Sequence, residues 1–228
     1  MKYIFVLICM MVFLVAPVMS ESVITTSGTS ERMVSPTYAT ISFEVSTENY
    51  KVVIAQSQNR EISGKVIDML LKSGISKEDI KTIGYNIYPV YDSGTYGYSG
   101  KVRSYRVSNT FQVCVRDLDR TGEIIDLVVS GGVNGVSSIS FGIDDDNVRN
   151  IKRDMLKEAV LNSKSDAEVI ASALDMEIIG VKDVSLSYTN IPRYSDAQYI
   201  LKESVSSTPI ESGLMKISTG VSITYLLN

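Results

Sequence analysis

Residues 144–186, with the sequence DDDNVRNIKRDMLKEAVLNSKSDAEVIASALDMEIIGVKDVSL, decide the fold. They begin with an acidic cluster, continue with a long helical pattern and end in a strand pattern. One stripe recurs at spacings of three and four residues, formed by Val148, Ile151, Met155, Ala159, Asn162, Asp166, Ile170 and Ala173. Beside this stripe, a second repeat with a spacing of four residues contains Ser163, Ala167 and Ala171. The spacing predicts a helix over 147–175, roughly 40 Å long at about 1.5 Å per residue, which needs a broad surface to cover.

Strand patterns along the rest of the chain can supply that surface. The predicted strands are 23–30, 37–47, 80–91, 102–115, 136–143, 181–188 and 214–226. In 37–47 and 214–226, polar and apolar residues alternate, which predicts sheets with one dry and one wet face. Pro89 in 80–91 indicates an edge strand or a bulge, because proline cannot donate to a β ladder.

Two further helices complete the predicted α+β fold, an antiparallel or mixed sheet packed by two long helices and one shorter helix. The second long helix covers 49–72 and stops at Gly74, and the shorter one covers 119–130 and stops at Gly131. There is also a faint internal echo, because both long helices lead through a glycine into a strand that ends Pro-x-Tyr. Two related β-α-β units would account for this echo, and so would chance, since the match is short.

The N-terminal segment has the pattern of an export signal. Lys2 supplies the positive start, 3–15 the apolar middle and 16–20 a helix-breaking exit of small residues. We expect cleavage after Ser20 and a folded domain over 21–228, in a periplasm or at a cell surface. A retained N-terminal anchor is the competing interpretation, because 3–19 is only just long enough to cross a bilayer.

The charge and cysteine content narrow the partners and the chemistry. The formal net charge is -4 and no basic block is present, which argues against nucleic acid and, after signal cleavage, against a membrane surface as partner. Cys9 is lost with the signal, so Cys114 remains alone and an internal disulfide is impossible. We interpret Cys114 as a buried, inert thiol in its strand, because a reactive thiol needs an electropositive neighbourhood.

One glycine-rich motif and one acidic motif have structural explanations. The glycines of 131–135 follow a helix and precede a strand, the reverse of the order that a phosphate-binding loop requires. The acids of 144–146 stand at a helix start, where capping and the helix dipole explain them better than calcium does. The sequence therefore predicts no catalytic, cofactor-binding or metal site.

Tyrosines on two loops are candidates for a contact surface instead. Tyr96 and Tyr98 lie in the glycine- and serine-rich segment 92–100, which we expect to be a flexible hairpin loop. Tyr194 and Tyr199 lie in the polar segment 190–209, an expected loop with a short helix near 196–202. Amphipathic rings on such loops lose little entropy on binding. Tyrosines on the strands are expected to pack.

Several short motifs occur in a recognisable order, although none is specific by itself. They are Thr26-Ser27-Gly28-Thr29-Ser30 before Pro36, Gly74-Ile75 with Asp79-Ile80-Lys81-Thr82, Pro89-Val90-Tyr91, Tyr105-Arg106-Val107-Ser108-Asn109, Asp117-Leu118-Asp119 with Ile124-Ile125-Asp126, and Thr208-Pro209-Ile210-Glu211-Ser212-Gly213. In this order they resemble the SIMPL domain family of exported bacterial and archaeal proteins. The chain departs from the family pattern at Pro36-Thr37 and at Gly132-Val133-Asn134. The resemblance implies long helices on antiparallel sheet, frequent homo-oligomers, proposed roles in envelope stress or protein association, and no cofactor.

The residues themselves argue against common enzyme classes. The chain has no His, which removes the usual general base, the Ser-His-Asp arrangement and most zinc sites. The first hypothesis is a non-enzymatic, exported interaction or scaffold protein that self-associates and can contact other envelope proteins. The second is a small-ligand-binding module with a pocket between helix and sheet near 190–209. The third is a carboxylate-dependent hydrolase.

Overall fold

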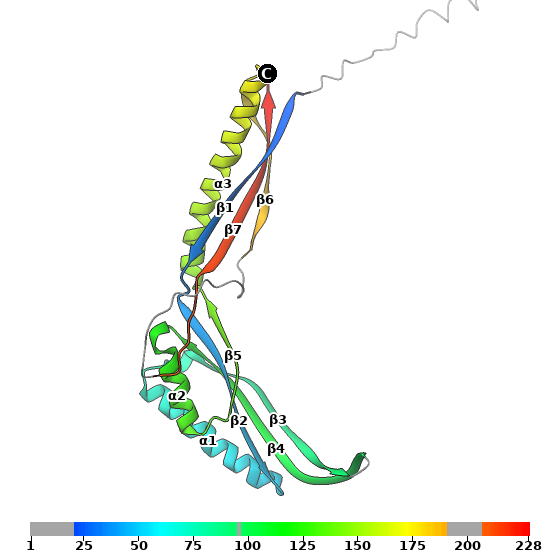
Figure 1. Ribbon diagram of the computed structural model, residues 1–228, viewed down its shortest axis with the longest axis vertical. Helices are drawn as coiled ribbons and strands as arrows, with labels where there is room; N and C mark the ends of the chain where they lie inside the picture. The colour runs from blue at the N-terminus through cyan, green and yellow to red at the C-terminus, as the bar shows by residue number, and fades with distance from the viewer. Residues whose placement is uncertain (1–20, 95–96, 191–206) are drawn as a thin grey trace, which may run out of the picture. The chain divides into compact units, whose positions relative to one another are not determined.

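The computed structural model describes residues 21–94, 97–190 and 207–228, over which the chain has an α+β fold (Figure 1). In chain order the elements are β1 Val23–Val34, β2 Tyr38–Asn49, α1 Val52–Lys72, the 3-10 helix η1 Lys77–Asp79, β3 Ile80–Gly94, β4 Gly97–Val115, the 3-10 helix η2 Leu118–Arg120, α2 Thr121–Gly131, β5 Gly135–Gly142, α3 Asp145–Ala173, β6 Ile178–Asn190 and β7 Met215–Leu227. Over the described residues the strands form two antiparallel sheets, ordered β1-β7-β6 and β3-β4-β2-β5. The predicted fold class is confirmed, with shifted ends for the individual elements.

The chain divides into two compact units. Of the described residues, the first takes in 21–29, 158–187 and 220–228, and the second takes in 30–94, 97–157, 188–190 and 207–219. None of the helices in the described ranges is long and apolar enough to cross a membrane. The segment predicted as an export signal, 1–20, and the short helix predicted at 196–202 lie outside the described residues.

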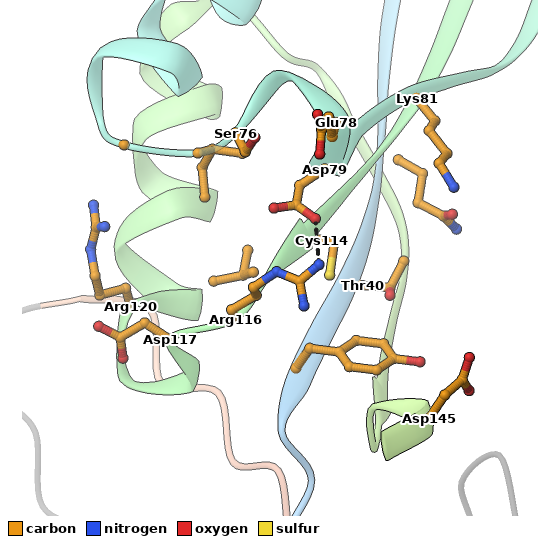
Figure 2. Close-up of a pocket in the computed structure, with 15 residues that line it drawn as sticks. Thr40, Ser76, Glu78, Asp79, Lys81, Cys114, Arg116, Asp117, Arg120 and Asp145 are labelled. Atoms are coloured by element: carbon orange, nitrogen blue, oxygen red, sulfur yellow. Dashed lines mark hydrogen bonds and ion pairs between the residues drawn. The ribbon is translucent and has the colours of Figure 1, made fainter. Parts of the chain in front are cut away.

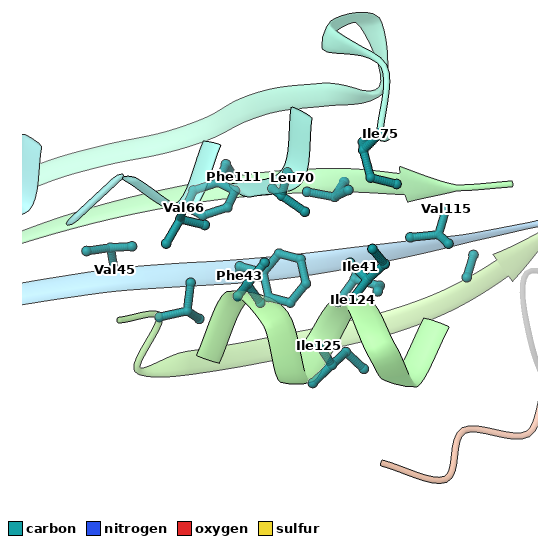
Figure 3. Close-up of a cluster of buried hydrophobic side chains, with 14 residues drawn as sticks. Ile41, Phe43, Val45, Val66, Leu70, Ile75, Phe111, Val115, Ile124 and Ile125 are labelled. Carbon is teal, nitrogen blue, oxygen red and sulfur yellow. The ribbon is translucent and has the colours of Figure 1, made fainter. Parts of the chain in front are cut away.

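The core of the second unit is built on the alternation of β2. Ala39, Ile41, Phe43 and Val45 are fully buried on one face of the four-stranded sheet. Figure 3 shows Val66 and Leu70 of α1 and Ile124 and Ile125 of α2 converging on this face. The rings of Phe43 and Phe111 pack with their centroids 5.9 Å apart. The predicted dry face of this strand is therefore confirmed, and burial of these large side chains contributes about 1.5–3 kcal/mol each.

The glycine stops of α1 and α2 are confirmed. At the end of α1 the Ser73 N–H donates to the Met69 carbonyl at 2.9 Å and the Ile75 N–H donates to the Leu70 carbonyl at 3.1 Å. These bonds satisfy carbonyls that the helix itself leaves without partners. At the end of α2, Gly132 has φ of 115°, which a side chain would resist.

The first of the two echoing segments forms a β-α-β unit and the second does not. β2 and β3 both pair antiparallel with β4, so they run parallel to each other with β4 between them, joined through α1. β5 and β6, which α3 connects, belong to different sheets. The internal echo in the sequence is thus not matched by a repeated topology.

The stripe predicted for α3 is right in its first half and wrong in its second, where the neighbouring small-residue repeat is buried instead. The fully or almost fully buried residues are Met155, Ala159, Ser163, Ala167 and Ala171, each four residues apart. Asn162 and Asp166 are exposed, and Ile170 is 42% exposed. A spacing of four drifts slowly around a helix of 3.6 residues per turn. Small residues at these positions let strands approach closely, as where the Thr26 hydroxyl donates to the Ser163 carbonyl at 2.8 Å.

The helix start confirms the capping interpretation of the acidic cluster. A carboxylate oxygen of Asp144 accepts the Asn147 backbone N–H at 3.0 Å. This backbone hydrogen bond, the largest cause, holds the pKa of Asp144 below its usual value. Asp145 and Asp146 follow in the first turn, where the helix dipole favours negative charge.

The β3–β4 hairpin confirms the edge position of Pro89 and corrects the loop that follows it. β3 is an edge strand, so the missing N–H of Pro89 costs no ladder bond on its outer side. The predicted loop over 92–100 is wrong, because the pairing continues to Ser93↔Tyr98 and Gly94↔Gly97. Glycine and serine have weak strand propensity, but the long hairpin carries the pairing through them, with register shifts between Val90 and Tyr91 and between Tyr91 and Ser93.

Gly28 of β1 provides a test of the close approach between strand and helix. A side chain at Gly28 would overlap the Ala159 carbonyl oxygen of α3, whereas one at Gly64 on α1 would meet open space. We expect Gly28→Ala to lower the free energy of unfolding by about 1–3 kcal/mol through overpacking. The control Gly64→Ala should raise it by about 0.5–1 kcal/mol, since alanine is the better helix former. Urea unfolding measures both, and equal stabilities for the two variants would contradict the packing.

Candidate functional site

A half-open cavity of about 880 Å³ lies in the second unit at one end of the four-stranded sheet. Its floor comes from strand residues, namely Tyr38 and Thr40 of β2, Gln112 and Cys114 of β4, and Lys81 of β3. Its walls come from the turns at the ends of strands and helices, namely Ser76, Glu78, Asp79, Arg116, Asp117, Arg120 and Asp145. Figure 2 shows the labelled side chains, among them Thr40, Asp79 and Arg116, around this end of the strands.

The alternation of the strands explains why the floor is polar. Thr40 pairs with Cys114, and Lys81 pairs with Gln112. These residues occupy the positions between the buried ones, so they face away from α1 and α2. The face that the sequence predicts to be wet is thus the floor of the cavity.

The arginines of the cavity already have carboxylate partners. Arg116 Nη2 lies 3.0 Å from Asp79 Oδ1, the pair joined by a dashed line in Figure 2. Arg120 binds Glu123 at 3.1 Å and also donates to the Ser73 carbonyl at 3.0 Å. The hydrogen bond to Arg120 lowers the pKa of the Glu123 carboxyl. These contacts place a carboxylate beside each guanidinium group and balance its charge.

Cys114 is less buried than predicted, but its raised pKa is consistent with the predicted inert thiol. The thiol is half-buried on the cavity floor, so it is not part of the apolar core. Burial, followed by the charge of Asp79, raises the pKa of the Cys114 thiol, while Arg116 and Lys81 lower it to a lesser degree. A raised pKa keeps the thiol protonated and slow as a nucleophile.

The position of the Tyr38 ring depends on a glycine of the neighbouring strand. Gly142 stands opposite Tyr38 in the β2–β5 register. A side chain at Gly142 would overlap the ring and hydroxyl of Tyr38, so the ring lies over the bare backbone there. The adjoining Thr37 holds the corner, since its N–H donates to the Gly142 carbonyl and its hydroxyl accepts the Asp144 N–H, both at 2.8 Å.

The opposite end of the same sheet face is closed by its own ion pairs. Glu48 of β2 accepts hydrogen bonds from Ser104, Arg103 and Arg106 of β4. The hydrogen bonds from Ser104, then Arg106 and Arg103, lower the pKa of Glu48 to about 2. Because these groups satisfy one another, this end of the face is a structural clamp between two strands.

A second cavity, of about 320 Å³, lies where the segment before β7 crosses α2. Its lining includes Ser207, Thr208 and Pro209, which belong to the segment where the sequence predicts a ligand pocket. The Thr208 N–H donates to Asp126 at 3.1 Å, and the Thr208 carbonyl lies against Gly122, where a side chain would overlap it. This cavity is thus walled by a segment that is fastened to α2, and the rest of the predicted pocket, 191–206, lies outside the described residues.

Three of the four predicted contact tyrosines lie outside the described residues, so their role as a contact surface stays a prediction. Tyr96, Tyr194 and Tyr199 lie outside the described residues, and the backbone of Tyr98 belongs to β4 opposite Ser93. Of the strand tyrosines expected to pack, Tyr85, Tyr88 and Tyr91 are exposed. The sequence analysis missed the cavity residues, although the polar alternation of 38–48 and 104–114 contained the signal for its floor.

An exposed apolar surface lies in the first unit. The edge strand β6 exposes Ile179 at 62%, Val181 at 55%, Val184 at 53% and Leu186 at 63%. Ile170 of α3 and Leu174, one turn further on, are also exposed. We call the four residues of β6 the β6 edge surface.

Metal-ligating side chains do not cluster in the part of the chain that the structure describes. Over residues 21–94, 97–190 and 207–228, no group of three or more His, Cys, Asp or Glu side chains could hold a metal ion.

Comparison with known proteins gives one family and several named relatives. The profile of the SIMPL family, described as a protein of unknown function (DUF541), matches residues 24–225. The 26 kDa periplasmic immunogenic protein of Brucella melitensis is 27% identical over 210 residues, 89% of this chain and 83% of that protein. The uncharacterized protein YggE of Edwardsiella ictaluri is 27% identical over 186 residues, 81% of this chain and 77% of that protein. The YggE protein of Escherichia coli K12 is 27% identical over 169 residues, 73% and 66% of the two chains.

Removing the negative or the positive charge beside Cys114 should change its reactivity in opposite directions. In a Cys9→Ser background, Cys114 is the only cysteine of the chain. Asp79→Asn should lower the thiol pKa and speed alkylation by iodoacetamide at neutral pH, because Asp79 raises that pKa. Arg116→Gln should raise the pKa and slow alkylation, because Arg116 lowers it. The pH dependence of the alkylation rate measures both shifts, and shifts of the same sign would contradict the described electrostatics.

Proposed function

Because the chain belongs to the SIMPL family, we propose that it is an exported, non-enzymatic contact protein of the cell envelope that assembles with further copies of itself. The location rests on the export pattern of 1–20 and on the Brucella relatives, which are named periplasmic proteins. An exported protein of this kind can reside in a periplasm or at a cell surface. The envelope-stress role implied by the family would be carried out through such contacts.

The β6 edge surface is the observation that carries the proposal. Successive side chains of a strand point to opposite faces, so Ile179 and Val181 lie on one face and Val184 and Leu186 on the other. Apolar residues on both faces are typical of a strand covered on both sides, yet β6 is an edge strand and exposes them. Its outer backbone groups are available for pairing with another strand. Covering this surface would bury apolar area that solvent now contacts.

A second copy of the chain is the partner that fits this surface. An isologous interface uses the same patch on both subunits, so antiparallel pairing of two β6 strands needs no further binding site. It would extend the three-stranded sheet across the pair and bring apolar side chains of both copies together on each face. Lys182 and Asp183, between the apolar pairs, would limit open-ended aggregation, as charges on edge strands do.

The titratable groups support a role without catalysis. A general acid near neutral pH needs a carboxyl pKa raised from its usual value. The resolved carboxyl shifts among the described residues, those of Glu48, Glu123, Asp126 and Asp144, are all downward. The chain contains no His to serve as a general base, and the raised pKa of Cys114 keeps this thiol protonated.

The oligomeric state tests the proposal. We expect the exported protein to scatter light as a multiple of the mass of its processed single chain at micromolar concentration. Val181→Lys with Leu186→Lys should shift it towards the monomer, because one charge is then placed on each face of the edge. The matched control is Val53→Lys with Val129→Lys, which adds the same charge at exposed valines of α1 and α2 and should leave the mass unchanged.

A strictly monomeric wild-type protein would overturn self-association. An oligomer that resists the β6 substitutions but dissociates in the control would place the interface on another surface.

A further inference from the structure

We propose that the cavity at the end of the four-stranded sheet binds an uncharged sugar, through hydrogen bonds to its polar side chains and contact of the sugar ring with Tyr38. This site lies in the second unit and does not depend on the β6 edge surface. The cavity volume of about 880 Å³ falls within the range of small-molecule sites, about 300–1,000 Å³. It is half-open, so a free sugar and the end of a glycan chain can both enter.

The charges of the cavity argue against an anionic ligand. Anion sites present guanidinium or ammonium groups with spare charge. Here Arg116 is paired with Asp79 at 3.0 Å and Arg120 with Glu123 at 3.1 Å. Four lining carboxylates, those of Glu78, Asp79, Asp117 and Asp145, stand against three lining cations. A phosphate or carboxylate would therefore have to displace the carboxylate partner of either arginine, in a lining where acids outnumber cations.

The composition also argues against an apolar ligand and a bare metal ion. Ile75 and Val115 supply the aliphatic side chains of the lining, and both are buried beneath the surface. The described carboxylates and Cys114 do not converge into a group that could hold a metal. What the lining does offer is uncharged or charge-balanced hydrogen-bonding groups.

Those groups match the hydrogen-bonding needs of sugar hydroxyls. A hydroxyl both donates and accepts, so its ideal site presents donors and acceptors side by side. The hydroxyls of Thr40 and Ser76 and the amide of Gln112 can each do both. The Asp79–Arg116 pair adds acceptor and donor atoms beyond the one bond that joins them, since a guanidinium carries five N–H groups.

Tyr38 supplies the apolar contact that a sugar ring needs. A tyrosine ring offers a flat apolar face and a polar tip, and Tyr38 is half-buried at the cavity with its ring over Gly142. Because Gly142 has no side chain, the ring is held in a position that any other residue there would change. The aromatic platform is thus built into the register of β2 and β5.

The topology favours a sugar over a peptide. Peptides are commonly recognised by adding a strand to an open sheet edge, where backbone groups are free. Of the three floor strands, β2 and β4 are inner strands with ladders on both sides, and the edge strand β3 contributes Lys81. Recognition in this cavity therefore falls to side chains, which suits hydroxyls better than a peptide backbone.

The test uses the full chain with Cys9→Ser, so that Cys114 on the cavity floor reports occupancy. The probes are glucose, N-acetylglucosamine, maltotetraose and chitotetraose, with inorganic phosphate and triglycine as comparators. Calorimetry measures binding, and protection of Cys114 from iodoacetamide locates it. We expect at least one sugar to bind saturably and protect Cys114, and the two comparators to do neither. Tighter binding of a tetrasaccharide than of its monomer indicates a glycan chain, and equal binding indicates a free sugar.

Two variants and a control separate the site from the fold. Thr40→Val keeps the side-chain shape and removes one hydroxyl, so it should weaken sugar binding about three- to tenfold. Gly142→Ala displaces the Tyr38 ring and should weaken it at least as much. Tyr88→Ala, on β3 opposite Arg106 of the Glu48 clamp, lies at the other end of the sheet and should leave sugar binding unchanged.

Several results would overturn the proposal. Absence of protection by every sugar would do so, as would protection by phosphate or triglycine in place of a sugar. Sugar binding that is unaffected by Thr40→Val in a folded protein would place the ligand elsewhere and equally reject this site.

Discussion

The second unit depends on the strict alternation of β2. This strand lies inside its sheet, paired with β4 on one side and β5 on the other. Ala39, Ile41, Phe43 and Val45 form the floor of the core, and the residues between them face the opposite side. A slip of one residue would exchange these sets and expose the core. The same constraint that stabilises the fold therefore also assembles the polar floor of the cavity, where Thr40 meets Cys114.

Local patterns in the sequence predicted most of the fold. Alternation located the strands, and glycine stops located the ends of α1 and α2, because both signals are read within a few residues. The buried stripe of α3 was predicted correctly only as far as Ala159. Beyond it, the choice between Asn162 and Ser163 depends on which strand lies opposite, as when the Thr26 hydroxyl meets the Ser163 carbonyl. Tertiary partners settle such a choice, and periodicity alone cannot.

The cavity was beyond the reach of sequence patterns for the same reason. Its floor joins Thr40 to Cys114 and Lys81 to Gln112, residues that the sheet register makes neighbours. The pairing of Arg116 with Asp79, and the room that Gly142 leaves for the Tyr38 ring, are likewise long-range. Without the register, an isolated Arg or Gly carries no sign of its role. The sequence therefore directed attention to the tyrosines of loops, which composition does make visible.

The two surfaces proposed for function rest on different physics and lie in different units. The β6 edge surface offers apolar area and free backbone groups, whose stabilisation on burial is non-directional and tolerates small shifts. The cavity offers oriented hydrogen-bonding groups held by ion pairs, whose contribution depends on exact distance and angle. Assembly should consequently survive conservative apolar exchanges in β6 that keep its hydrophobicity. Recognition in the cavity should fail when a single fixed group such as Thr40 or Gly142 changes. Substitutions in β6 and in the cavity can then be used separately to distinguish assembly from ligand binding, because the two surfaces share no residues.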